Sequence, residues 1–279
     1  MVTPFSEDGK TVDYALFERL CEQQIRCGTD ALVIAGTTGE SPVLSAEEKR
    51  ALFSAAVKTA ANKIPVISGT GANDTEAAVR KSNDAEKEGV NALLVVTPYY
   101  NKCTQEGLIE HYYYIADRVS VPIIVYNVPS RTGVNILPDT YAALGEHKNI
   151  VAVKEANGDI SALAQTIRLC GDSLDIYSGN DDQTAAFTAL GGKGVISVAA
   201  NIIPEQMHKM ASERENNAEI QLRYNDLLKA LFLEVNPIPV KAAMEMIYKK
   251  PFPLRLPLTR ISAKNNEKLQ NVLLEHHLI

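Results

Sequence analysis

Short runs of apolar residues that recur along the chain are the feature that most constrains how it can fold. Each run is nearly continuous in Val, Ile and Leu and does not alternate with polar residues, a pattern typical of strands buried on both faces of a parallel sheet. Helical patterns, with apolar residues four positions apart, separate the runs. The sequence therefore predicts a parallel α/β fold with strands at 31–36, 64–69, 92–98, 121–127, 149–155, 174–179 and 193–199.

The number of runs indicates which parallel fold forms. If Met1–Phe5 is the tail of a first strand, the chain has eight strand–helix units, which close into a (β/α)8 TIM barrel. Only two residues precede Thr3-Pro4, so this first strand is expected to be short or to begin upstream. An open doubly wound sheet is the alternative, but no group of glycines fits G-x-G-x-x-G. We therefore predict a barrel domain over 1–215 and a C-terminal helical extension over 216–279, with helix across 222–250.

Capping residues mark two helix starts. Ser45 and Glu48 have the spacing of a capping box, in which each side chain accepts a hydrogen bond from the backbone amide of the other residue. Asn73 and Glu76 repeat this spacing before the next helical pattern. We therefore expect helices to begin directly after Ser45 and Asn73, and an earlier helix over 12–27 to end before Gly28.

Composition and charge narrow the class of partner. The 279 residues carry a net charge of −6 and the basic residues are scattered, whereas nucleic acids and anionic membranes require a concentrated positive surface. No segment reaches the roughly 18 apolar residues of a membrane helix, and the N-terminus lacks the pattern of a signal peptide. The cysteines and histidines show no metal-ligand spacing. We therefore expect a cytoplasmic protein without a metal that acts on a small molecule.

Lys154 is the strongest candidate for a catalytic residue. Active sites of barrels form at the C-terminal ends of the strands, and Lys154 lies near the end of the otherwise apolar run 149–155. Burial there favours the neutral amine, which can attack a ketone to form a Schiff base. The alternative interpretation is a strand-end lysine that pairs with Glu155 or faces solvent. No cysteine, histidine or metal-type cluster lies at the other strand ends, which favours covalent amine chemistry.

Other polar side chains follow neighbouring strands. Tyr126 ends the preceding run and could shuttle protons during imine formation, or it could simply fill the barrel rim. Thr37 and Thr38 lie between glycines in a turn whose amides and hydroxyls could bind a carboxylate. Arg131 could hold a carboxylate through two parallel hydrogen bonds, although a surface arginine needs no function. These residues favour a site for a small substrate that carries a carboxylate.

Six segments along the chain together resemble one known family. They are GTTGES (36–41), TPYYNK (97–102), YNVPSRTG (126–133), VAVKEA (151–156), GVISV (194–198) and NPIPVK (236–241), and they cover essentially the whole chain. Their combination resembles the dihydrodipicolinate synthases, within the pyruvate-dependent class I aldolase family that also contains N-acetylneuraminate lyase. Six motifs in this order are far more specific than any one of them.

The resemblance implies a reaction and a role for each matching residue. Lys154 would form a Schiff base with pyruvate, and the enamine would condense with L-aspartate 4-semialdehyde to give 4-hydroxy-tetrahydrodipicolinate, a step of lysine biosynthesis by the diaminopimelate pathway. No metal and no cofactor beyond this imine are implied. The implied site residues are Tyr126, Thr38 and Tyr100 as a proton relay, Thr37 and Thr38 for the pyruvate carboxylate, Arg131 for the semialdehyde carboxylate, and Gly179 and the Ile196 carbonyl as pocket walls.

The resemblance also implies an assembly and a mode of regulation. Tyr100 would come from the partner subunit of a tight dimer, and a dimer of dimers is the first expectation. In lysine-inhibited members, imidazoles take the places of Ala46 and Lys49, and a carboxylate takes the place of Ala77. We therefore predict weak or absent inhibition by lysine, although a residual effector site remains at Ser41, Lys49, Asn73 and Tyr99.

Two alternatives remain open at this point. Another pyruvate aldolase, such as an N-acetylneuraminate or 2-keto-3-deoxy sugar acid lyase, would share Lys154, but Arg131 favours a second substrate with its own carboxylate. A catalytically silent barrel that binds a small carboxylate is the other alternative. It would have no need for Lys154, Tyr126, Thr38, Tyr100 and Arg131 together.

Overall fold

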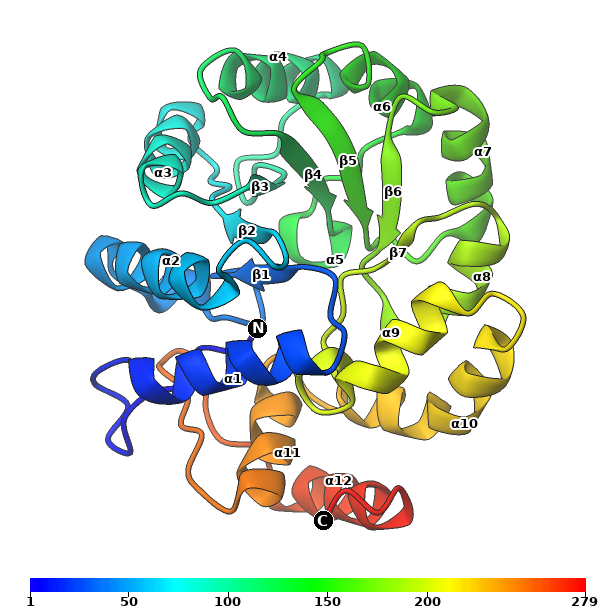
Figure 1. Ribbon diagram of the computed structural model, residues 1–279. Helices are drawn as coiled ribbons and strands as arrows, with labels where there is room; N and C mark the ends of the chain where they lie inside the picture. The colour runs from blue at the N-terminus through cyan, green and yellow to red at the C-terminus, as the bar shows by residue number, and fades with distance from the viewer.

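The structure, a computed structural model, describes residues 1–279 and places all seven predicted runs in one parallel sheet (Figure 1). Each strand pairs with the next along the chain, and every connection between neighbours contains at least one helix. The seven predicted strands are thus confirmed. Their bounds are β1 (Leu32–Ile34), β2 (Val66–Gly69), β3 (Ala92–Val96), β4 (Ile123–Asn127), β5 (Ile150–Glu155), β6 (Asp175–Ser178) and β7 (Gly194–Val195).

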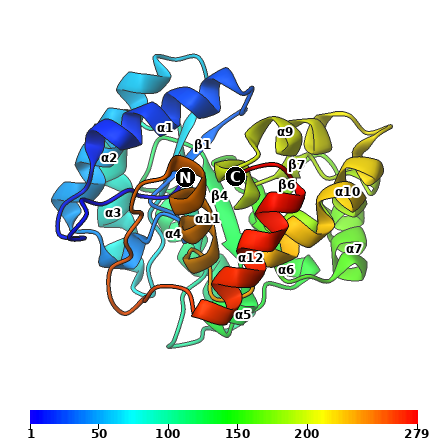
Figure 2. The same ribbon diagram turned by 90° about the horizontal axis from the view of Figure 1, so that it is seen from below.

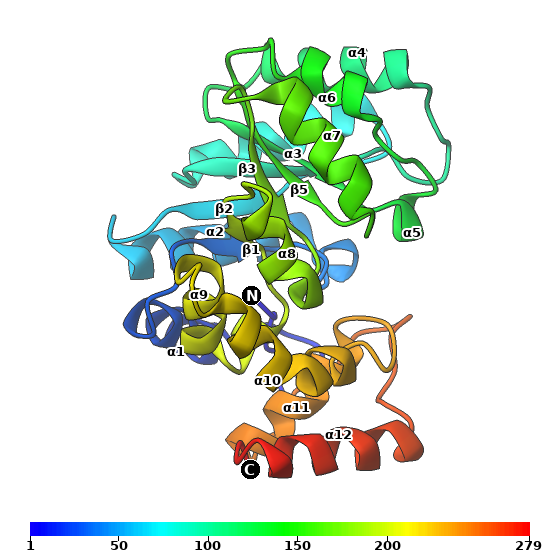
Figure 3. The same ribbon diagram turned by 90° about the vertical axis from the view of Figure 1, so that its right-hand side faces the viewer.

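The sheet curls, and helices cover its outer face (Figure 1, Figure 3). Both faces of each strand are therefore buried. Val95 and Val125 pack in the main core cluster, whereas Leu94 and Ile124 pack in a small inner-face cluster with the inner side chains of neighbouring strands. The helices of this part are α1 (Tyr14–Arg26), α2 (Ala46–Ala60), α3 (Thr75–Lys87), α4 (Gln105–Ala116), α5 (Pro129–Thr132), α6 (Pro138–Leu144), α7 (Ile160–Cys170), α8 (Thr184–Ala189) and α9 (Pro204–Ser212), with short 3-10 turns at Ser41–Val43, Asp181–Gln183 and Ala199–Asn201.

The capping residues confirm one predicted helix start and correct another. Ser45 and Glu48 form the expected capping box at the start of α2. At the start of α3 the cap is Asp74, whose carboxylate accepts from the Ala77 amide at 2.6 Å. The prediction of Asn73 was wrong by one residue, because asparagine and aspartate side chains can both cap and the local pattern did not separate them.

The eighth strand predicted at Met1–Phe5 does not form, so that prediction was wrong. Two contacts tie this segment to the two sides of the sheet. The Met1 ammonium donates to Val33 O at 2.9 Å, and the Val2 amide donates to Asn201 Oδ1 at 2.9 Å. A strand in a ladder needs a run of amide donors, and Pro4 has none. As a result, β1 and β7 do not pair with each other.

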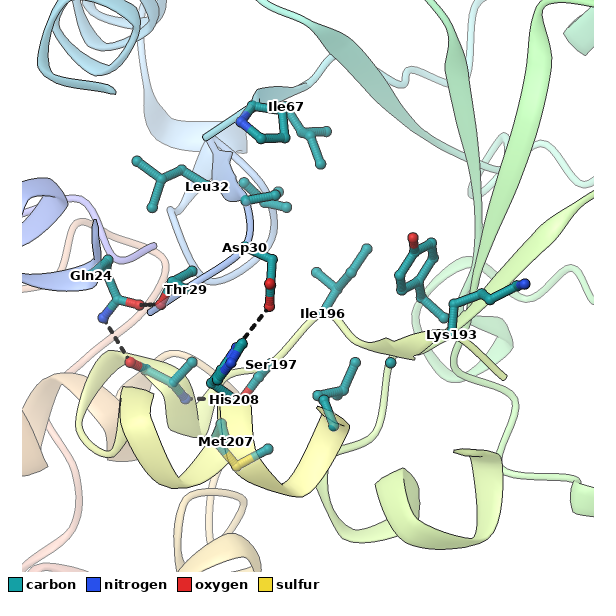
Figure 4. Close-up of a pocket in the computed structure, with 18 of the residues that line it drawn as sticks. Gln24, Thr29, Asp30, Leu32, Ile67, Lys193, Ile196, Ser197, Met207 and His208 are labelled. Atoms are coloured by element: carbon teal, nitrogen blue, oxygen red, sulfur yellow. Dashed lines mark hydrogen bonds and ion pairs between the residues drawn. The ribbon is translucent and has the colours of Figure 1, made fainter. Parts of the chain in front are cut away.

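A cavity of about 560 Å³ lies between β1 and the segment that contains β7 (Figure 4). Side chains bridge it in place of a strand. The His208 ring of α9 forms a hydrogen bond with the Asp30 carboxylate at 3.0 Å, and Gln24 of α1 donates to Ala200 O at 2.7 Å. Ile196 lines the same cavity on the side of β7 (Figure 4). The open side of the curled sheet is therefore held by α1 and α9.

The C-terminal extension consists of three helices, of which α11 and α12 lie below the sheet in Figure 1 and in front of it in Figure 2. They are α10 (Asn217–Ala230), α11 (Ile238–Tyr248) and α12 (Ala263–Glu275). The prediction of helix across 222–250 was wrong between α10 and α11, because Pro237 has no amide to continue the helix. A second core cluster joins the extension to α1 and α9. The division into domains at 215/216 stays a prediction.

The packing of α12 generates a stability prediction. Leu273 is fully buried in the second core cluster, whereas Leu274 is 50% exposed. Leu273→Ala is expected to lower the free energy of unfolding by about 2–5 kcal/mol, because it removes buried methyl groups and leaves a cavity. Leu274→Ala is the matched control and should change it by about 0.5 kcal/mol or less. Urea denaturation measures both, and equal effects would contradict this packing.

Candidate active site

Lys154 lies in the middle of a row of three side chains on neighbouring strands. The register pairs Lys154 of β5 with Tyr126 of β4 and with Tyr177 of β6. Residues in register on adjacent strands point to the same face, so these side chains share the inner face of the sheet near its C-terminal edge. The Lys154 Nζ atom lies 4.4 Å from the centre of the Tyr126 ring. The structure thus brings the predicted amine and phenol together.

Glu155 points to the opposite face and is fully engaged there. Its carboxylate accepts hydrogen bonds from the Tyr141 hydroxyl at 2.6 Å, from Asn127 Nδ2 at 3.0 Å and from the Asn157 amide at 2.8 Å. Burial raises the pKa of Glu155, and these hydrogen bonds oppose the rise. The interpretation in which Glu155 neutralises Lys154 is therefore wrong.

A glycine keeps space free beside the Lys154 side chain. A Cβ atom at Gly179, just after β6, would lie 3.1 Å from Lys154 Cε and 2.6 Å from Ala156 Cβ, closer than carbon atoms normally pack. Two residues later, the buried Asp181 carboxylate accepts from two consecutive amides after β7, at 3.0 and 2.8 Å. Burial raises the pKa of Asp181, while its hydrogen bonds and the Lys154 charge oppose the rise. The Asp181 hydrogen bonds thus hold the segment after β6 against the segment after β7.

The turn after β1 carries Thr37 and Thr38 and is held by the C-terminal extension. Asn236, between α10 and α11, donates from Nδ2 to Thr38 Oγ1 at 3.0 Å. The backbone oxygen of Asn236 accepts a hydrogen bond from the Arg131 guanidinium at 3.2 Å. Because Thr38 Oγ1 accepts from Asn236, the hydroxyl proton of Thr38 can be donated to another group. Asn236 therefore links the threonine turn to Arg131.

A buried ion pair anchors the same turn. Glu40 follows the two threonines in a left-handed backbone conformation (φ 55°) and forms an ion pair with Lys241 of α11. The exposed fractions of the Glu40 and Lys241 side chains are 0% and 1%. Lys241 also donates to Pro253 O at 2.8 Å. Burial lowers the pKa of Lys241 to about 8, and the Glu40 charge opposes this change. The turn is thus fixed by a charge pair that water does not reach.

Several predicted site residues line one cavity of about 360 Å³. Thr37, Tyr126 and Arg131 are part of its wall, and Asn236 closes it on the side of the extension. Lys154 is not part of this wall and lies beside Tyr126. Of the predicted effector residues, Ser41, Lys49 and Tyr99 line the cavity, whereas Asn73 does not.

Two predicted site residues lie elsewhere. Ile196 lines the larger cavity between β1 and β7, and its amide donates to Ser178 O at 2.9 Å. Tyr100 projects from the loop after β3 with its side chain 89% exposed. Its backbone φ of 75° is a left-handed conformation that is unfavourable for tyrosine. Neither side chain contributes to the wall that contains Thr37.

Metal-type clusters and membrane-spanning helices are both absent from residues 1–279. Nowhere in residues 1–279 do three or more His, Cys, Asp or Glu side chains gather closely enough to hold a metal ion. None of the helices combines the length and the apolar character needed to cross a bilayer. All four cysteines are free thiols.

Comparison with known proteins identifies the family. The profile of the dihydrodipicolinate synthetase family matches residues 1–276. A 4-hydroxy-tetrahydrodipicolinate synthase from Thermoanaerobacter sp. (strain X514) is 50% identical over 285 residues, which cover 100% of this chain and 95% of that protein. The chain belongs to the dihydrodipicolinate synthetase family.

Solved structures of the dihydrodipicolinate synthetase family share the fold. Dihydrodipicolinate synthase from Thermotoga maritima matches with a TM-score of 0.97 at 45% identity, over 100% of this chain and 97% of that one. A protein described as a monomeric dihydrodipicolinate synthase variant matches with a TM-score of 0.97 at 46% identity, over 100% of this chain and 95% of that one. The predicted TIM-barrel class is therefore confirmed, although the ladder in this chain has seven strands.

Sequence reasoning missed residues that support the site in this dihydrodipicolinate synthetase family protein. Asn236 and Lys241 belong to the NPIPVK segment that carried the resemblance, but no local pattern indicated their contacts. Asn236 meets Thr38 across 198 residues of chain. Lys81 of α3, which also lines the 360 Å³ cavity, had no sequence signal.

Breaking the buried ion pair should destabilise this family member. Lys241→Met leaves the buried Glu40 carboxylate without its ion-pair partner and with the Arg255 amide as a donor, so the free energy of unfolding should fall by about 3–5 kcal/mol. Adding Glu40→Gln to Lys241→Met should recover part of the loss, because the uncompensated charge is gone. Lys250→Met breaks the more exposed Lys250–Asp13 pair and should cost about 1 kcal/mol or less. Denaturant unfolding measures all three variants. A Lys241→Met loss as small as that of the control would mean that the pair does not anchor the turn.

Proposed function

We propose that this protein is a 4-hydroxy-tetrahydrodipicolinate synthase, a lyase that condenses pyruvate with L-aspartate 4-semialdehyde through a Schiff base on Lys154. The main support is the placement of Lys154: its amine is half-buried, unpaired with Glu155, next to the Tyr126 ring and beside the space that Gly179 leaves open. A relative with this name that matches the whole chain supports the same reaction. The product would serve the diaminopimelate route to lysine.

The first half of the proposed reaction activates pyruvate. The neutral Lys154 amine attacks C2 of pyruvate, and loss of water from the adduct leaves an imine. Proton transfers accompany both steps, and the proposed carriers are Tyr126, Thr38 and Tyr100 of the partner subunit. Tyr126 lies beside the amine, and Thr38 has a free hydroxyl proton because Asn236 donates to its oxygen.

The second half forms the carbon–carbon bond and closes the ring. Loss of a proton from C3 of the imine gives an enamine, whose C3 attacks the aldehyde carbon of the semialdehyde. The aldehyde oxygen takes up a proton and becomes the hydroxyl group. The amine of the semialdehyde then adds to C2 and displaces the Lys154 amine, which closes the ring and frees the enzyme. The water lost on imine formation balances the equation, and the scheme requires no metal or further cofactor.

Carboxylate binding selects the substrates in this proposal. The amides and hydroxyls of Thr37 and Thr38 hold the pyruvate carboxylate, and Arg131 holds the carboxylate of the semialdehyde. In this proposal, Gly179 and the Ile196 carbonyl form part of the pocket wall. Another pyruvate aldolase would use Lys154 equally, but a sugar aldehyde needs no arginine at this position. A silent carboxylate-binding barrel would need no amine beside Tyr126.

The proposed assembly is a tight dimer in which Tyr100 completes the site of the neighbouring subunit, with a dimer of dimers as the full particle. An aromatic side chain that is 89% exposed on an unfavourable backbone conformation costs free energy unless a partner covers it. Tyr99 is 38% exposed next to it and lines the cavity of its own subunit. This arrangement would bring the two cavities of a dimer close to its interface.

The proposal extends to regulation and location. Lys49 stands where lysine-inhibited members of the family carry an imidazole, and its ammonium would repel that of lysine. Millimolar lysine should therefore leave most of the activity in a condensation assay. The enzyme is proposed to act in the cytoplasm, where pyruvate is available.

Borohydride trapping tests the proposed chemistry. Wild-type protein incubated with pyruvate and borohydride should carry a reduced adduct on the peptide that contains Lys154, as measured by mass spectrometry. Lys154→Ala should give no adduct and no condensation, whereas Lys148→Ala, which removes an exposed lysine just before β5, should behave as wild type. An adduct elsewhere, or full activity of Lys154→Ala, would reject the mechanism. Rapid condensation with a sugar aldehyde, and none with aspartate semialdehyde, would favour the lyase instead.

Mixed dimers test whether Tyr100 is shared between subunits. Lys154→Ala and Tyr100→Phe should each be nearly inactive, but subunit exchange should create dimers that have one site with both native residues. Random exchange should restore about a quarter of the wild-type activity. Lys154→Ala mixed with Tyr126→Phe is the control and should restore none, because no subunit then holds both native residues. Equal results from the two mixtures would contradict a shared site.

A further inference from the structure

Two lysines that form no ion pair, Lys49 and Lys81, line the 360 Å³ cavity. Lys49 comes from the first turn of α2, and Lys81 comes from α3. Both side chains are half-buried. The hydroxyl-bearing side chains of Ser41 and Tyr99 line the same cavity. The reaction proposed above gives neither lysine a role.

The carboxylates near these lysines interact with other groups. Glu40 is the single acidic residue in the cavity wall, and Lys241 binds it. On the two helices and their caps, Glu47 pairs with Arg50, Glu48 with Arg255, the N-cap Asp74 with Arg80, and Asp84 with Lys87. The other two acids of α3 accept hydrogen bonds, Glu76 from the Tyr114 hydroxyl and Glu86 from the Ser120 amide. Lys49 and Lys81 therefore face the cavity without an ion pair, whereas the more deeply buried Lys241 has one.

Burial and repulsion act on both ammonium groups. Burial, followed by the charge of Lys81, lowers the pKa of Lys49 to about 8. Burial, followed by the charge of Arg80, lowers the pKa of Lys81, and Asp74 partly opposes this. Lys49 is still mostly protonated at neutral pH, so the two ammonium groups repel each other across a partly desolvated space. A bound anion would supply the missing counter-charge.

We propose that Lys49 and Lys81 form a binding site for a small dianion, a dicarboxylate or a phosphate, in the part of the cavity lined by α2 and α3. Two ammonium groups match two negative charges, and the hydroxyls of Ser41 and Tyr99 can donate to the same ligand. A monoanion would leave one ammonium unmatched, and an amine would add a third positive charge. The site uses groups other than Lys154 and Arg131, so it does not depend on the proposed condensation.

A weaker role for the two lysines makes different predictions. Both proposed substrates carry carboxylates, so the lysines could merely attract them into the cavity without holding a ligand of their own. A dianion with its own site must bind in a fixed number per subunit, also while pyruvate is attached to Lys154. Attraction alone gives no such binding and weakens steadily with ionic strength.

Isothermal titration with malonate and with inorganic phosphate tests the proposal, on wild-type protein whose active site has been filled with pyruvate and reduced with borohydride. One dianion per subunit should bind, and the double variant Lys49→Met/Lys81→Met should bind it about tenfold more weakly or worse. The matched control Lys58→Met/Lys87→Met removes two exposed lysines from the same helices and should bind as wild type. Every titration is run at equal ionic strength set with sodium chloride. The tighter of the two dianions identifies the ligand as carboxylate or phosphate.

Three results would overturn the dianion site. They are no binding of either dianion to the wild type, equal affinity in the two double variants, and loss of binding once pyruvate fills the active site. Thermal denaturation of each variant establishes that it is folded. If borohydride traps no pyruvate, the proposed reaction fails, but titration of untreated protein with the two double variants still decides the dianion site.

Discussion

Parallel pairing of short strands that are buried on both faces fixes where polar chemistry can lie in this molecule. The faces are filled with Val, Ile and Leu, so charged groups are tolerated only where a strand ends. Pairing in register then aligns those ends and places Tyr126, Lys154 and Tyr177 in one row. Because side chains alternate along β5, Lys154 points inward and Glu155 points outward to Tyr141. Two opposite charges that are adjacent in the sequence therefore do not neutralise each other.

This constraint explains why the strands could be predicted and the closure of the barrel could not. Continuous apolar runs are a local consequence of burial on both faces, and each run became a strand. The barrel class predicts an eighth strand at Met1–Phe5, although this segment lacks such a run. The structure bridges this side with contacts such as the one between Asp30 and His208, which are 178 positions apart. No local pattern contains that information.

The residues of the candidate site also fall into two groups, those that the sequence predicts and those that it does not. Lys154, Tyr126 and the threonine turn could be predicted because strand ends are local features. Asn236 and Lys241 could not, because their roles arise only when the extension packs against the turn after β1. A buried ion pair is weak support for stability, since desolvation offsets its attraction. Its strict geometry does, however, restrict the Glu40 backbone to one arrangement, which makes the extension part of the site.

Lysines without an ion pair have two different roles in this chain, and the groups around each lysine distinguish these roles. A carboxylate in contact with Lys154 would stabilise its ammonium form and suppress nucleophilic attack, so the absence of a partner suits covalent chemistry. Lys154 is single and lies beside a phenol on the inner face of the sheet. Lys49 and Lys81 form a pair on helices, repel each other and share a cavity with hydroxyl groups. A carbonyl compound would leave that repulsion in place, whereas an anion with two charges would remove it.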